Sequence, residues 1–182
     1  MRAARGGANR KAAPSLTAKD VYADPMHKNP YAEPLGSRDP MQALGETPEK
    51  IRELASRWSE AQWNGSYEPG KWTARQILVH LAQTELALTT RVRFALSEEN
   101  YRAQPFSQDA WMANEAGADG RTALDAYLAL RRLNVLLFRS LTPEQRRRPF
   151  QHPEYGELNA EWVAAQLAGH DLHHLAQLER IR

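Results

Sequence analysis

One long segment constrains the fold more than any other part of this chain. Residues 71–96 read KWTARQILVHLAQTELALTTRVRFAL and contain the pair Thr73 and Gln76, in which each side chain can bind the other's free backbone N–H group. Such a capping box predicts a helix that begins at this pair. Apolar residues then recur every three to four positions, which predicts a long amphipathic helix with one face against a core: Ile77, Leu81, Leu88, Val92 and Ala95.

Three further segments carry helix signals. TPEKIRELASRW offers Thr47 as N-cap and Pro48 as the first helical residue. RTALDAYLALRRLNVLLFRSL predicts a helix from Thr122 to about residue 141, and Asn159 is a good N-cap for a last helix that runs to about residue 181. No segment shows convincing period-2 alternation, so we expect no sheet. The four helices together predict an all-α four-helix bundle.

The segments between these helices are expected to be irregular. Residues 99–121 form a long connection in which PFSQDAWMANEA could hold a short helix or a lid, and residues 142–159 form a polar connection. Residues 1–38 carry repeated prolines and no helical period, which predicts a flexible or extended N-terminal arm. The bundle domain is therefore expected over residues 39–182.

Composition limits the classes of function. The 182 residues suit one domain, and 24 Lys and Arg against 22 Asp and Glu give no argument for a nucleic-acid or membrane partner. Cysteine is absent, which excludes disulfides, cysteine-ligated zinc and a cysteine nucleophile. With neither an apolar run long enough to span a bilayer nor a secretory signal, we expect a cytoplasmic protein that acts on a small molecule.

Histidines give the strongest functional signal. His170 and His174 are four residues apart on one face of the last predicted helix, and His80 lies on the apolar stripe of the helix over residues 71–96. If the two helices pack together, three imidazoles could hold one divalent cation and leave coordination positions open. Spacing alone leaves a second interpretation open, in which the same residues are buried and hydrogen-bonded or solvated.

The neighbours of these histidines have weaker expected roles. HDLHH has the spacing of the zincin motif, but Asp171 replaces its glutamate, so we reject a protease and expect Asp171 to be a solvated helix charge. Glu85 is turned away from the expected ligand on its own helix, and His173 lies on a neighbouring helix face, next to the site or at the surface. Gln177 could orient a ligand or a bound water, or it could be an ordinary polar residue.

The two histidine segments also resemble a known family. GKWTARQILVHLAQTE and GHDLHHLAQLER resemble the first and last motif blocks of the DinB-like, or YfiT-like, metal-binding four-helix bundles, and DPMQALGETPEKI resembles their opening. The resemblance covers about residues 39–182. It implies an up-down-down-up bundle, metal ligands at His80, His170 and His174, zinc or nickel as the ion, and a homodimer.

The resemblance also implies a choice of functions. One is a metal-dependent hydrolase or thiol-dependent S-transferase, the latter with a low-molecular-weight thiol as cosubstrate. A second is a metal- or ligand-binding stress protein without turnover. A third possibility, from the residues alone, is a metal-free helical dimer whose histidines are structural. No residue is identified as the catalytic base at this level.

Overall fold

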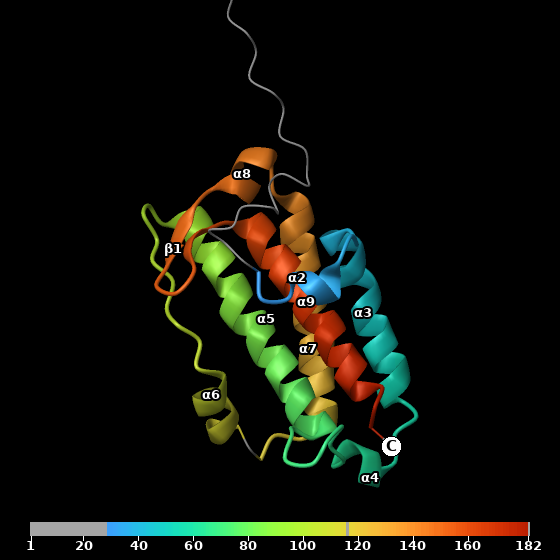
Figure 1. Ribbon diagram of the computed structural model, residues 1–182. Coiled ribbons are helices and arrows are strands. Elements are labelled where there is room, and N and C mark those ends of the chain that lie inside the picture. The colour runs from blue at the N-terminus through green and yellow to red at the C-terminus, as the bar shows by residue number, and fades with distance from the viewer. Residues whose placement is uncertain (1–28, 116, 182) are drawn as a thin grey trace, which may run out of the picture.

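Four long helices make up the body of the molecule in the computed structural model, which describes residues 29–115 and 117–181 (Figure 1). They are α3 (Pro40–Ala55), α5 (Ala74–Ser97), α7 (Gly120–Ser140) and α9 (Ala160–Leu178). α5 and α7 run in one direction and α3 and α9 in the other, so the chain passes up, down, down and up through the bundle. The predicted all-α four-helix bundle is confirmed.

α5 and α7 follow each other among the long helices, run parallel and pack together. The chain must therefore return along the whole bundle between them. The connection of residues 98–119 makes this return and contains the short helix α6 (Gln108–Asn114), as the sequence suggested. The other short helices are α2 (Ala32–Leu35), α4 (Glu60–Trp63) and α8 (Pro143–Arg147). The long return connection places α6 and the residues before it beside α5.

Helix starts agree with the sequence at two places and differ at two. The Thr73–Gln76 capping box and the Asn159 cap are both present. α3 begins at Pro40 instead of Pro48, because the Asp39 side chain accepts a hydrogen bond from the backbone N–H of residue 42 at 2.7 Å. α7 likewise begins at residue 120, where the side chain of residue 119 is the cap. The expected start at Thr47 and Pro48 was therefore wrong.

The expectation of no sheet was also wrong in one place. β1 (Phe150–His152) and β2 (Gly156–Leu158) form an antiparallel hairpin in which Gln151 pairs with Glu157. Strands of three residues are too short for a period-2 signal to be recognised. The segment of residues 101–103 joins β1 through two backbone hydrogen bonds, Ala103 N–H to the Gln151 carbonyl at 2.8 Å and Gln151 N–H to the Tyr101 carbonyl at 3.0 Å.

Two apolar clusters fill the bundle, and a polar layer separates them along α9. The first cluster includes residues of α9 up to Ala168, and the second resumes at Leu175. Between these positions the buried side chains of α9 are those of His170, Asp171 and His174. α5 and α7 contribute further buried polar side chains to the molecule's interior, namely His80, Gln83, Thr84, Glu85, Thr89, Arg91, Arg131 and Asn134. Polar side chains in the middle of a bundle point to a functional or specificity role.

The part of the expected arm that the structure describes lies against the bundle. α2 packs on α9 and buries Leu35. Residues 1–28 of the expected arm, including His27, lie outside the described residues. Within the described ranges, no helix combines the length and the apolar character needed to cross a membrane.

Candidate metal centre

The three histidines singled out from the sequence meet in the polar layer. His170 Nε2 is 2.9 Å from His80 Nε2 and 3.1 Å from His174 Nε2, and all three residues are buried. Two imidazole nitrogens on one tetrahedral zinc ion, with bonds of about 2.0–2.1 Å, lie about 3.3 Å apart. The two separations from His170 are therefore close to what one shared ion requires, and the candidate ligand atoms of the three residues all lie within 4.8 Å of one another.

Helix geometry and aromatic walls position these rings. His170 and His174 project one turn apart from α9, and the packing of α5 on α9 places His80 opposite them. The Trp72 ring lies 4.8 Å from the His80 ring, and the Phe106 ring is nearly parallel to the His80 ring, with their centroids 6.1 Å apart. These aromatic contacts restrict ring rotation and shield the nitrogens from bulk water.

Burial keeps the three imidazoles neutral. Loss of solvation lowers the pKa of His80 to about 4 and that of His174 to about 3, the latter with a contribution from the charge of His80. Desolvation, followed by repulsion from His174 and His80, holds the pKa of His170 well below its usual value. Neutral imidazole is the form that binds metal ions, so the site is ready for a cation at neutral pH.

These lowered pKa values predict how the metal-free protein responds to acid. The unfolded chain takes up a proton at His80 near pH 6.5, whereas the folded protein does so only near pH 4. Stability is therefore lost as the pH falls through this window. Between pH 7 and pH 5 we expect His80 alone to account for a loss of about 2 kcal/mol in the free energy of unfolding.

Urea denaturation in the presence of a chelator at the two pH values, for wild type and His80→Gln, measures this loss. The substitution should shrink the difference between the two pH values, and groups that titrate equally in both proteins cancel. An identical pH dependence in wild type and variant would contradict the assignment.

Gln177 contacts one of the three rings, and the sequence left open whether it orients a ligand or is an ordinary polar residue. Its Oε1 lies 2.7 Å from His174 Nδ1 and can only accept, so the His174 proton is on Nδ1 and the Nε2 lone pair is directed toward the other histidines. The amide nitrogen of Gln177 contacts His173 Nε2 at 2.9 Å and donates to the Tyr67 hydroxyl at 3.2 Å. His173 thus lies beside the cluster, next to the three convergent rings.

Two cavities border the histidine cluster. One, of about 290 Å³, touches His174, Gln177 and His173, and the other, of about 200 Å³, touches His170. Tyr31 and His80 line both. The cluster is therefore open to small molecules from two cavities, which suits a site that keeps free coordination positions.

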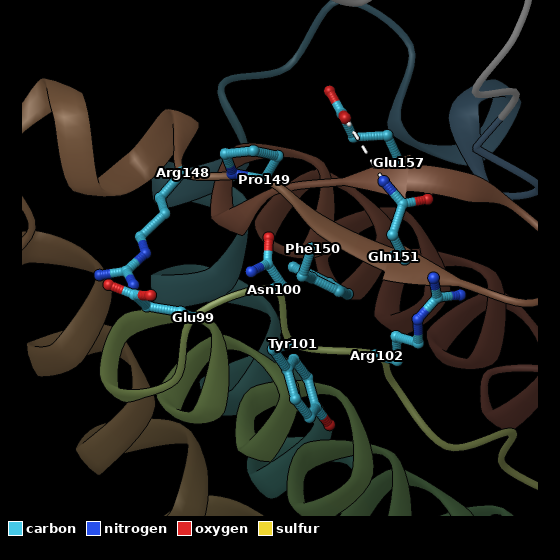
Figure 2. A pocket seen from close by; sticks show the side chains of 9 residues that line it. All are labelled: Glu99, Asn100, Tyr101, Arg102, Arg148, Pro149, Phe150, Gln151 and Glu157. Carbon is cyan, nitrogen blue, oxygen red and sulfur yellow. Dashed lines mark hydrogen bonds between the residues drawn. The ribbon is translucent and has the colours of Figure 1, made fainter.

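A larger hollow of about 540 Å³ lies elsewhere, between the hairpin and the connection of residues 99–102. Figure 2 shows it lined by side chains of both charges, among them Glu99, Arg102 and Arg148, together with Phe150 and Tyr101. It contains no histidine, and none of its lining residues belongs to either cavity at the histidine cluster. Its lining offers side chains of both charges and no candidate metal ligand. We therefore assign no chemistry to it.

The described end of the N-terminal arm forms part of the site, which the sequence did not reveal. The Tyr31 ring meets the His170 ring edge-on at 4.8 Å. This approach depends on Gly169, because a Cβ atom there would lie 2.1 Å from the Tyr31 carbonyl oxygen. A glycine inside a helix costs about 1 kcal/mol relative to alanine, so its presence beside the cluster has a packing reason.

Gly169→Ala should therefore release the arm and leave the bundle folded. We expect hydrogen exchange in residues 29–36 to increase at least about tenfold, while α5 and α7 keep their protection. Gly45→Ala on α3 is the matched control, since a methyl group added there would meet no atom within 4 Å. Equal exchange in both alanine variants would show that the arm does not depend on this contact.

A buried ion network lies next to the histidine cluster and was also missed. Arg131 donates to Asp171 Oδ2 at 2.5 Å and, through Nε, to Glu85 Oε1 at 3.0 Å. Asn134 donates to the second oxygen of Glu85 at 2.7 Å, and the Tyr127 hydroxyl donates to Asp171 at 2.7 Å. Asp171 is only 1% exposed, so its expected role as a solvated helix charge was wrong.

The backbone of α3 also contributes to this network. Pro48 lies inside α3 and has no N–H group, so the carbonyl of Leu44 lacks its usual helical donor. Arg131 Nη1 donates to that carbonyl at 3.4 Å. The sequence signal that could have indicated the network is an arginine and an asparagine, three residues apart, on the otherwise apolar face of α7. Glu85 does not reach the histidines, as expected.

Comparison with known proteins agrees with this architecture. Bacillus subtilis "Putative metal-dependent hydrolase YfiT" is 28% identical over 144 residues, which cover 78% of this chain and 81% of the relative. A relative from Oceanobacillus iheyensis with the same functional description is 28% identical over 136 residues, or 74% of this chain and 79% of the relative.

Solved structures agree as well. The structure of Bacillus subtilis YfiT, described as having an unusual four-helix bundle topology, superposes with a TM-score of 0.73 at 24% identity and covers 94% of this chain and 90% of its own. A mycothiol-dependent maleylpyruvate isomerase shares the fold with a TM-score of 0.64 at 13% identity, covering 76% and 59%. The family model of the DinB superfamily matches residues 43–178. The chain therefore belongs to the DinB superfamily.

Proposed function

We propose that this protein is a metal-dependent hydrolase that holds one divalent cation on His80, His170 and His174. The observation that carries the proposal is a buried cluster in which the Nε2 atoms of His80 and His174 both approach that of His170, at the border of two cavities. The names of the relatives, which describe metal-dependent hydrolases, support it. We propose zinc or nickel as the native ion, since imidazole ligands suit both.

The residues of the chain have separate tasks in this proposal. When bound, the ion supplies Lewis acidity and brings the pKa of a coordinated water to about 7. Gln177 holds the proton of His174 on Nδ1, so that Nε2 stays available as a ligand. Trp72 and Phe106 limit water around the rings, and Tyr31 borders both approaches to the cluster.

Cobalt substitution tests the proposal. We expect metal-free protein to bind one Co²⁺ per chain with the intense visible bands of a four- or five-coordinate ion. These bands should shift with an apparent pKa near 7 as a coordinated water ionises. Hydrolysis of an ester panel should follow the same pKa and stop on addition of a chelator. A weak octahedral spectrum without a pH response would contradict an open three-histidine site.

The two cavities favour a second candidate, a thiol-dependent S-transferase. Two separate spaces at one metal centre could take two reactants, and the chain has no cysteine, so a thiolate would come from a small molecule. Addition of 2-mercaptoethanol to the cobalt protein should then produce a sulfur-to-cobalt charge-transfer band in the near ultraviolet. A metal-binding stress protein without turnover, the remaining alternative, predicts the bound ion and no catalysis with either class of substrate.

We also propose that the chain forms a homodimer through α5 and α7. These helices expose four large apolar side chains, Leu86, Phe94, Leu133 and Leu136, the last of them 64% exposed. Apolar surface of this kind marks interfaces. Leu136→Glu should convert a dimer into a monomer in size-exclusion chromatography with light scattering, whereas Lys50→Glu on α3 should not. A monomeric wild type would refute the proposal.

A further inference from the structure

Arg91 is a buried cation that the metal site does not explain. The residue is 7% exposed, and its Nη2 donates to the Gln104 carbonyl at 2.9 Å. Within residues 29–115 and 117–181 it forms no ion pair, whereas the other buried arginine, Arg131, pairs with two carboxylates. A guanidinium stays charged in proteins, and a buried charge without a counter-charge is costly.

The cavity of about 200 Å³ joins this cation to the histidine cluster. His80, Thr84, Leu88 and Arg91 all line it and recur every three to four residues, so they form one wall along a single face of α5. The Cα atoms of His80 and Arg91 are on the order of 16 Å apart along the helix axis. The cavity is therefore long and narrow, with the arginine toward one end and the imidazoles toward the other.

Polar groups without protein partners also border this cavity. Thr84 Oγ1 and Gln166 Oε1 are buried and have no hydrogen-bond partner in the described part of the chain. His152 Nδ1 accepts the backbone N–H of residue 154 at 3.2 Å, so the proton of its neutral ring is on Nε2, which becomes a donor. Buried polar groups are normally hydrogen-bonded, so these atoms can bond a polar group that enters the cavity.

Apolar side chains occupy the stretch between the two ends. Leu88 is buried, and Phe106 is half-buried and stacks with His80. Phe106 belongs to the connection between α5 and α7. Residues 101–103 of this connection bind the backbone of Gln151 and lie beside β1 in Figure 2. The same connection carries the Gln104 carbonyl that orients Arg91. The hairpin thus holds the connection that carries Phe106 and the Gln104 carbonyl, whereas Leu88 belongs to α5.

We propose that this cavity recognises a small, elongated carboxylic acid, with its carboxylate on Arg91, its apolar body against Leu88 and Phe106 and its far end at the histidines. The reacting end rests on the proposed function, whereas recognition of the acid needs no metal. The volume is below the about 300–1,000 Å³ of most ligand pockets, which limits the acid to a short chain or a single ring.

One carboxylate of the protein faces the same cavity. Glu154 in the hairpin turn is exposed. Desolvation lowers the pKa of Arg91, and the charges of Tyr101, Glu154 and Tyr155 act in the opposite direction. Glu154 forms no ion pair with Arg91 in the described ranges, so the guanidinium remains available. Glu154 would repel an incoming carboxylate, and removal of its charge should strengthen acid binding.

Hexanoate and its neutral counterpart hexanamide test the proposal on metal-free protein in a chelator, with affinities from ligand-observed saturation-transfer NMR. We expect wild type to prefer hexanoate by about tenfold or more, because a hydrogen bond between two charged groups is stronger than one from the guanidinium to a neutral amide. Arg91→Met should abolish the preference, and Glu154→Gln, an exposed change that leaves Arg91 in place, should raise it. Arg102→Met removes an exposed charge outside the cavity and should leave it unchanged.

Three results would overturn the proposal: equal binding of acid and amide to wild type, an equal loss in Arg91→Met and Arg102→Met, or no gain in Glu154→Gln. Cobalt binding, measured on a second portion of each preparation after the chelator has been removed, keeps the two proposals apart. Bound cobalt without acid preference refutes the acid site alone, and acid preference without cobalt binding refutes the metal-dependent function alone.

Discussion

His170→Ala should deprive the protein of its metal. Wild type purified without a metal-affinity tag is expected to contain one divalent ion per chain by elemental analysis, and His170→Ala almost none. His170 is the central ring of the cluster, within 3.1 Å of both other Nε2 atoms, so its loss leaves two ligands on opposite helices. The affinity should fall by more than the about 10- to 100-fold that loss of an outer-shell partner costs.

His173→Ala is the matched control for this experiment. His173 lies three residues away on the same helix and contacts Gln177 instead of the three convergent nitrogens. Its removal should leave the metal content at one ion per chain. Circular dichroism of both variants checks that α9 is intact. A wild type that holds little metal even after zinc or nickel is added and the excess removed would mean that the histidines only pack, and the enzyme proposal would fail.

Arg131→Met should be the most destabilising single change in the polar layer. The substitution leaves the carboxylates of Glu85 and Asp171 buried without a cation. Breaking a buried ion pair by removing one partner typically costs about 3–5 kcal/mol, because the remaining charge stays desolvated. We expect a loss of this size in the free energy of unfolding, measured by urea denaturation at pH 7.

Two further variants test whether the loss comes from the unpaired carboxylates. Arg132→Met, at the exposed neighbouring position, should change stability by less than about 0.5 kcal/mol. Combining Arg131→Met with Glu85→Gln and Asp171→Asn should restore much of the loss, because no uncompensated charge remains. If Arg131→Met costs no more than Arg132→Met, the network does not contribute to stability in the way its burial implies.

The helices and the candidate histidine cluster could be predicted from the sequence because both depend on local periodicity. A capping box at Thr73 and an N-cap at Asn159 act over three residues, and the spacing of His170 and His174 guarantees a shared helix face. Local signals misled at Pro48, where a good helix start occurs inside a helix. Pro48 has no N–H to donate to the Leu44 carbonyl, and the side chain of Arg131, distant in sequence, donates to it instead.

The sequence by itself therefore indicated the helical bundle, the three histidines and, as one of two interpretations, a place for Gln177 beside them. Tertiary structure alone decided that Asp171 and Glu85 pair with Arg131, that Tyr31 reaches the cluster over Gly169, and that Arg91 faces a cavity. The physical reason is that a charged or aromatic residue can have the same sequence neighbours whether its side chain lies at the surface or in the interior. Its role depends on which distant helix desolvates it, and packing sets that.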